Sequence, residues 1–174
     1  MSPTLRTERL LLNEYTLCDE ESFVALFCDE DVVRWMGEGP QPEAQIRALF
    51  GRVFDVYREK RFDVWAVRLD GRHVGHAEIK RTDTVDGYEL IYALAPSVWR
   101  QGVGTELARA IVEYGFGVLG LDEVHATVHA DNVGSFALLR RLGFEHVRDI
   151  DDGHTTRVLT MHGPGRRPRR PGPG

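Results

Sequence analysis

The stretch WRQGVGTE, residues 99–106, stands between a predicted strand at residues 88–94 and a predicted helix at residues 104–119. Its glycines, Gly102 and Gly104, let the backbone turn tightly and bring several N–H groups to one point. The following helix adds the free N–H groups of its first turn and the positive end of its dipole. Such a loop is suited to hold a phosphate or pyrophosphate, although a Gly-x-Gly before a helix also occurs as an ordinary turn.

Hydrophobic periodicity along the rest of the chain predicts an α/β fold with one central sheet flanked by helices. Alternation with a period of two indicates strands at residues 9–15, 62–69, 73–81, 88–94, 123–129, 144–150 and 155–161. Helical spacing and capping residues indicate helices at residues 19–28, 29–36, 42–60, 104–119 and 132–142. The expected sheet is single, mixed and mostly antiparallel.

Length and composition are those of one globular domain. The chain has 174 residues, of which 42% are apolar and 28% are charged, so disorder of the whole chain and a fibrous repeat are excluded. We expect the domain to span residues 1–162. Residues 163–174 contain only Gly, Pro and Arg and are expected to form a disordered tail.

The net charge of −5 is unevenly distributed. Four of the 22 basic residues lie in the tail, so residues 1–162 carry 18 basic and 27 acidic side chains, a net charge of −9. This acidic body argues against a broad nucleic-acid surface and against strong nucleic-acid binding. The arginine-rich tail has two interpretations, a solubilising end or a tether to RNA or another anionic partner.

The sequence shows no signal for secretion, membrane insertion or metal binding. The N-terminus lacks the apolar segment of a signal peptide, and no apolar run approaches the ~20 residues needed to cross a bilayer. Cys18 and Cys28 form no CxxC motif and are expected to be buried as small hydrophobic residues. His125 and His129 share a face of one strand but lack a third ligand. We therefore expect a cytoplasmic protein without membrane association and without a metal.

A second motif begins about thirty residues after the glycine loop. Residues 132–144 read NVGSFALLRRLGF, which has the pattern Asn-x-x-Ser-x-x-Leu-Leu-x-Arg-x-Gly-Phe. Together with the loop, its leading Trp99 and the opening TERLLL at residues 7–12, this motif resembles the GNAT family of acyl-CoA-dependent N-acyltransferases. More narrowly, it is similar to the RimJ/RimL-type branch of ribosomal-protein N-terminal acetyltransferases. The resemblance covers roughly residues 4–162.

The resemblance implies that acetyl-CoA is the co-substrate. In this family the glycine loop binds the pyrophosphate of coenzyme A, here through the backbone N–H groups of Gln101, Gly102, Val103, Gly104 and Thr105. Arg100 would add a charged contact, or be an ordinary solvated loop residue. The strands at residues 88–94 and 123–129 would splay apart, with the pantetheine arm between them. Asn132 would bind the cofactor at the mouth of this gap, or cap the helix that follows.

The resemblance also assigns the chemistry. Many members carry a Tyr as general acid where this chain has Leu139. Ser135, one helical turn earlier, is therefore the expected proton donor or hydrogen-bond partner of the coenzyme A sulfur, unless it bonds to a local backbone carbonyl. Glu89 is the expected base for the attacking amine, with Glu78 in reserve, unless Glu89 forms a salt bridge or faces outward. The N–H of Leu94 or a neighbour would hold the oxygen of the tetrahedral intermediate.

Acetyl transfer from acetyl-CoA to a primary amine, with both substrates bound at once, is the function that the resemblance implies. The acceptor is a protein N-terminal amine or a small-molecule amine, and residues 33–36 with Trp65 are expected to shape its site. The acidic body would favour a cationic amine. The missing Tyr leaves one alternative, a catalytically weak sensor or regulatory module that binds acyl-CoA. A longer acyl chain and a homodimer also stay open.

Overall fold

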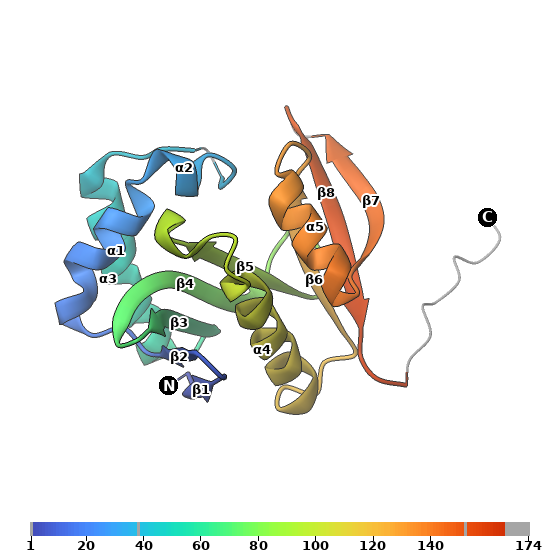
Figure 1. The fold of residues 1–174 in the computed structure, drawn as a ribbon, viewed down its shortest axis with the longest axis horizontal. Helices are drawn as coiled ribbons and strands as arrows, with labels where there is room; N and C mark the ends of the chain where they lie inside the picture. Colours follow the sequence, from blue (N-terminus) through green and yellow to red (C-terminus); the bar gives the residue numbers. More distant parts are fainter. Residues whose placement is uncertain (1, 38, 152, 166–174) are drawn as a thin grey trace.

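The computed structural model describes residues 2–37, 39–151 and 153–165. In this part of the chain, one sheet has the strand order β1-β2-β3-β4-β5-β6-β8-β7 (Figure 1). The strands are β1 Leu5–Arg6, β2 Leu10–Asn13, β3 Asp63–Leu69, β4 Arg72–Arg81, β5 Tyr88–Leu94, β6 Glu123–His129, β7 Glu145–Asp151 and β8 Thr155–His162. The helices are α1 Glu20–Phe27, α2 Glu30–Val33, α3 Glu43–Glu59, α4 Val103–Gly117 and α5 Val133–Leu142. The predicted α/β fold with a single, mostly antiparallel mixed sheet is confirmed.

The sheet opens between β5 and β6. Strand β5 is antiparallel to β4 and pairs with it from Tyr88 to Leu94. Its pairing with β6 is parallel and is limited, within the described residues, to Glu89 opposite His125. Beyond Glu89 the two strands diverge, as the resemblance implied.

Two hydrophobic cores cover opposite faces of the sheet. On one face α4 and α5 lie side by side (Figure 1), and the predicted apolar stripe of α4, which includes Leu107 and Ile111, is buried there. On the other face α1 and α3 bury Phe23 and Phe50 against Ala66 of β3. A fully buried Leu, Ile or Phe side chain contributes about 1.5–3 kcal/mol to the free energy of folding. Several such side chains hold the helices on each face of the sheet.

Side chains of β5 alternate between these two faces. Leu90, Tyr92 and Leu94 belong to the core beneath α4, whereas Ala93 belongs to the core beneath α1 and α3. Glu89 shares the face of Ala93 because the two residues are an even number of positions apart. Strand β5 therefore presents Glu89 on one face of the sheet and Tyr92 on the other.

Some local expectations need correction. Cys18 and Cys28 are exposed, not buried, because they lie just outside the two ends of α1, whose apolar residues turn inward. The strand predicted at residues 9–15 is limited to Leu10–Asn13, and the two-residue β1 before it is too short to show alternation in the sequence. Most of the predicted tail, residues 166–174, lies outside the described residues. Gly163 is held in place, since its N–H donates to the Asp122 carbonyl at 2.8 Å.

Candidate active site

A cleft of about 1880 Å³ follows the gap between β5 and β6. Its walls come from the β1–β2 hairpin, α2, β5, the start of α4, the end of β6 and α5. Pockets for drug-sized ligands occupy roughly 300–1,000 Å³. This cleft therefore has room for a long ligand together with a second substrate.

The glycine loop at the start of α4 presents unpartnered N–H groups. Arg100 and Gly102 both adopt left-handed conformations, with φ of +61° and +78°, so the loop winds tightly before the helix. The first hydrogen bond of α4 runs from the Glu106 N–H to the Gly102 carbonyl at 3.1 Å. Within the described part of the chain, no N–H of residues 100–105 has an acceptor in hydrogen-bonding geometry. These groups and the helix dipole make the loop fit for a diphosphate.

Side chains of the loop divide into those that line the cleft and those that hold the loop. Arg100 and Thr105 line the cleft, as does Gly104, where an added Cβ would lie 2.8 Å from Leu138 Cδ1 on α5. Gln101 and Val103 do not line it. The Gln101 amide donates to the Ser97 carbonyl at 2.8 Å, and Val103 is fully buried in the core. Any contact of these two residues with a ligand would therefore be through their backbone.

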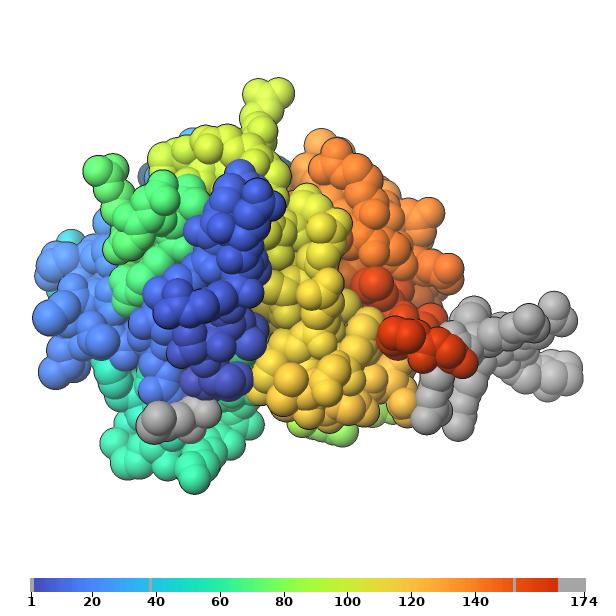
Figure 2. Space-filling view, turned by 60° about the horizontal axis from the view of Figure 1, so that its bottom comes forward, coloured from blue at the N-terminus to red at the C-terminus, as the bar shows by residue number. Residues whose placement is uncertain are grey.

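The β1–β2 hairpin braces the loop through Arg9, a residue of the TERLLL motif to which the sequence analysis assigned no role. Figure 2 shows the hairpin, in dark blue, lying along α4, in yellow. The Arg9 guanidinium donates from Nε to Glu106 Oε2 at 2.7 Å and from Nη1 to the Gln101 carbonyl at 2.9 Å. Thr7 Oγ1 donates to Glu106 Oε1 at 2.5 Å. Burial alone would raise the pKa of Glu106, but the hydrogen bonds from Thr7 and Arg9 and the charge of Arg9 lower it below its ordinary value.

Replacing Glu106 by Gln should loosen this brace. We expect a lower free energy of unfolding at neutral pH and coenzyme A binding that is several-fold weaker, because a charge-assisted hydrogen-bond network is lost. The folded-state pKa of Glu106 is depressed, so its contribution to stability is present above the unfolded pKa of about 4.3 and is lost as the pH falls through the folded pKa. Thermal unfolding of E106Q and wild type across pH 3–7 measures this. The exposed Glu113 on the same helix offers the control E113Q, and equal losses in both variants would contradict the brace.

Backbone groups of β5 face the open side of the gap. The Ala95 N–H donates to the Val74 carbonyl of β4 at 2.8 Å, and successive N–H groups of a strand point to opposite sides. The Leu94 N–H therefore points toward β6, where pairing has ended. The Leu94 carbonyl accepts from Trp99 Nε1 at 2.7 Å, which ties the glycine loop to the end of the strand.

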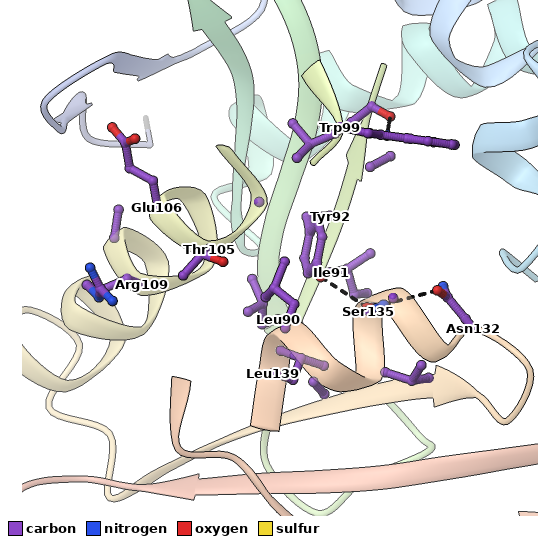
Figure 3. Close-up of a pocket in the computed structure, with 18 of the residues that line it drawn as sticks. Leu90, Ile91, Tyr92, Trp99, Thr105, Glu106, Arg109, Asn132, Ser135 and Leu139 are labelled. Carbon is purple, nitrogen blue, oxygen red and sulfur yellow. Dashed lines mark hydrogen bonds between the residues drawn. The ribbon is translucent and has the colours of Figure 1, made fainter. Parts of the chain in front are cut away.

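Ser135 and Asn132 lie at the first turn of α5, on the other wall of the cleft (Figure 3). Asn132 Oδ1 accepts from the Ser135 N–H at 3.1 Å, so Asn132 caps the helix and has its amide nitrogen left for a ligand. Ser135 Oγ lies 3.0 Å from the hydroxyl of Tyr92 on β5, and Leu139 follows one turn later as a buried residue. Tyr92 was missed by the sequence analysis; its alternation with Leu90 and Leu94 was the available signal.

Glu89 sits at the closed end of the gap, on the face opposite Tyr92. Its carboxylate is buried, with the residue 4% exposed. It accepts hydrogen bonds from Thr82 Oγ1 at 2.6 Å and from Thr127 Oγ1 of β6. No salt bridge to Glu89 is present in the described residues, and the residue lines the cleft. The Glu89 carboxylate therefore borders the gap from the face of the sheet opposite Tyr92, where it could accept a proton from a ligand in the gap.

Glu78, the reserve base, is committed to other partners. His76 Nε2 lies 3.0 Å from Glu78 Oε1, and Lys80 Nζ lies 2.5 Å from Glu78 Oε2. Burial alone would raise the pKa of Glu78, but the hydrogen bond from His76 and the charges of His76 and Lys80 lower it to about 2. A carboxylate with such a low pKa is a weak base, and Glu78 does not line the cleft.

A row of three aromatic rings lies beside the cleft on the Glu89 side. The Trp35 ring, after α2, lies 4.7 Å from the ring of His129 at the end of β6, and His129 stacks on His154 at 4.9 Å. Trp35 lines the cleft with Arg34 and Met36. Val33 and Trp65 do not shape it, contrary to expectation. Val33 is buried in the core with α1 and α3. Trp65 is buried in the other core, because alternation along β3 turns its side chain toward α4.

In residues 2–37, 39–151 and 153–165, no group of three or more His, Cys, Asp or Glu side chains is placed to hold a metal ion. None of the helices described there has the length and apolar character to cross a bilayer.

Comparisons with known proteins agree with this geometry. Residues 9–145 match the family model described as an acetyltransferase (GNAT) domain. The uncharacterized N-acetyltransferase YoaA of Bacillus subtilis (strain 168) is 33% identical over 153 residues, which cover 83% of this chain and 84% of that protein.

Solved structures share the fold at lower identity. The GNAT-family acetyltransferase from Bacillus anthracis superposes with a TM-score of 0.79 at 22% identity, covering 92% of this chain and 98% of that one. RimL, a ribosomal alpha-N-protein acetyltransferase in complex with coenzyme A, superposes with a TM-score of 0.79 at 11% identity and the same coverage.

Proposed function

This chain belongs to the GNAT family of acetyltransferases, and on that premise we propose that it acetylates a primary amine, which attacks acetyl-CoA directly while both substrates are bound. The acetyl donor is acetyl-CoA, as in the family. The observation that carries the proposal is the set of unpartnered N–H groups at residues 100–105. This loop lies at one end of the gap between β5 and β6. A diphosphate held there directs the attached thioester arm into the gap.

Each wall of the cleft has its own part in binding the donor. The N–H groups of Gln101, Gly102, Val103, Gly104 and Thr105 hold the pyrophosphate, and the Arg100 guanidinium adds a charged contact. The free backbone groups of β5 and β6 pair with the amides of the pantetheine arm, as an added strand pairs with a sheet edge. At the mouth of the gap, the amide nitrogen of Asn132 donates a further hydrogen bond to the cofactor.

Three groups serve the chemistry. The acceptor amine is mostly an ammonium at neutral pH, and Glu89 takes its proton directly or through a water. The Leu94 N–H donates to the thioester oxygen as negative charge develops on it, which is worth roughly 10²–10³ in rate for one such donor. Ser135 lies on the opposite wall and donates to the departing sulfur. Positioning of the amine against the thioester supplies most of the remaining rate enhancement.

The acceptor enters on the face of Glu89, past the contact between the rings of Trp35 and His129. It is a protein N-terminal amine or a small-molecule amine. The net charge of −9 over residues 1–162 favours cationic acceptors, because it raises their local concentration at the cleft.

Release of free thiol from acetyl-CoA tests the proposal. The acceptor panel contains peptides beginning with Ser, Ala or Met, polyamines and aminoglycosides, each beside a neutral amine of similar size, and succinyl-CoA is run in parallel. We expect amine-dependent release, faster with cationic acceptors. Binding of acetyl-CoA without release across the panel would instead identify an acyl-CoA sensor, and equal turnover of neutral and cationic amines would remove the charge preference.

A further inference from the structure

The phenol of Tyr92 and the hydroxyl of Ser135 form a hydrogen-bonded pair inside the cleft. We propose that Tyr92 supplies, through Ser135, the proton that the departing coenzyme A sulfur takes up. The proposal rests on the proposed function, and it assigns to β5 the phenol that α5 lacks at Leu139. Tyr92 acts through Ser135 and is in this sense a positioning residue.

The geometry holds both hydroxyls at one point. Figure 3 shows the Tyr92 ring reaching from β5 toward the first turn of α5, where Ser135 meets it. The two oxygens are 3.0 Å apart, and both residues line the cleft. The Ser135 N–H donates to Asn132 Oδ1 at 3.1 Å, and this cap fixes the turn that carries the serine. Tyr92 comes from β5 and Ser135 from α5, so the packing of these two elements sets the distance between the hydroxyls.

The direction of the hydrogen bond follows from acidity. A phenol is a stronger acid than an aliphatic hydroxyl, so Tyr92 donates to Ser135 Oγ and the serine proton is left to point into the cleft. Ser135 Oγ has no backbone carbonyl partner in the described residues, so the local bond considered from the sequence is not formed. Burial raises the pKa of Tyr92, and the hydrogen bond with Ser135 lowers it by less. The phenol is therefore protonated at neutral pH and able to donate.

The step balances without an oxidant or reductant. The amine nitrogen forms a bond to the thioester carbon, and the carbonyl electron pair moves to oxygen beside the Leu94 N–H. When that pair returns, the C–S bond breaks and its electrons stay on sulfur. Sulfur takes the Ser135 proton, Ser135 takes the Tyr92 proton, and Tyr92 regains one from water. The acceptor nitrogen loses two protons in all: Glu89 takes the ammonium proton before the attack, and the second leaves when the tetrahedral intermediate collapses to the amide. One of the two balances the proton that sulfur takes up, and the other passes to water.

The ionisation of coenzyme A bound to the protein tests this relay without an acceptor. The thiolate absorbs in the ultraviolet, so a pH titration of the binary complex gives the midpoint of the bound thiol. A complex with desulfo-coenzyme A serves as the blank and cancels the exposed Cys18 and Cys28. We expect the midpoint to lie about 1 pH unit higher in S135A than in wild type, because the thiolate loses a charge-assisted hydrogen bond. In Y92F the midpoint should rise by a smaller amount, because Ser135 keeps its bond to the sulfur but loses the phenol that polarises it.

Matched variants separate a relay from a packing effect. Y88F removes a hydroxyl from the same strand outside the cleft and should leave the midpoint unchanged. Adding Y92F to S135A should cause no further shift, because Tyr92 acts only through the serine. With an active amine, Y92F should lower kcat about 10- to 100-fold at constant KM.

The outcomes distinguish the two proposals. Failure of coenzyme A to bind would overturn the proposed function. Binding with the same thiol midpoint in wild type, Y92F and S135A would overturn the relay and leave the function intact. A shift in S135A without one in Y92F would assign the proton to serine alone and would also overturn the role of Tyr92. S135A lies at a partly exposed helix position and keeps the test usable if Y92F unfolds.

Discussion

Replacing Glu89 by Gln should lower kcat about 10²- to 10⁴-fold with the most active amine of the panel, which is the range that a positioned general base contributes. Gln has nearly the same shape, and it can accept from one of the two threonine hydroxyls, Thr82 or Thr127, through Oε1 and donate to the other through Nε2. The fold and the affinity for coenzyme A should therefore stay close to wild type. The amide cannot take a proton from the ammonium. Steady-state kinetics with isothermal titration of coenzyme A separates these two effects.

The matched control is Glu78→Gln, the same change one strand away on the same face. Glu78 is paired with His76 and Lys80 and lies outside the cleft, so E78Q should lower the melting temperature and leave kcat within a few-fold of wild type. If E89Q kept wild-type turnover, deprotonation of the amine would have to be assigned to water or to another group. The family and the binding site would be unaffected.

Replacing Gly102 by Val should weaken coenzyme A binding by about 10-fold or more. Gly102 has φ of +78°, a conformation that costs an L residue roughly 1–2 kcal/mol, and every 1.4 kcal/mol is a factor of ten in affinity. A loop that relaxes from this conformation turns the N–H groups of residues 100–105 away from the diphosphate. Titration calorimetry with coenzyme A measures the change.

Gly120→Val controls for the backbone strain. Gly120 also has positive φ, at +65°, and an added Cβ there has no atom within 4 Å, but the residue lies outside the cleft. Both variants should lose similar stability, and only G102V should lose affinity. Equal affinity in the two variants would show that the loop N–H groups do not hold coenzyme A.

Residues that act within one short segment could be predicted from the sequence. The glycine loop, the cap at Asn132 and the buried stripe of α4 are local features, because turn sterics, helix capping and the 3.6-residue period involve only near neighbours. The expected burial of Cys18 and Cys28 was wrong for a related reason. Residue type indicates an average exposure, but the ends of α1 decided theirs.

Contacts between distant segments could not be predicted in this way. Arg9 and Glu106 are 97 positions apart, and Tyr92 and Ser135 are 43 apart. No local pattern states that such residues meet, because their separation depends on how the sheet and helices pack.

The sequence by itself determined the order of the elements other than β1, the loop that presents its N–H groups and the helix that carries Ser135. Only the tertiary structure decided that Glu89 and Tyr92 lie on opposite sides of the gap, that Arg9 braces the loop and that a phenol from β5 meets Ser135. The physical reason is range: backbone conformation responds to neighbours a few residues away, whereas the site is assembled by burial of side chains from segments far apart in the chain.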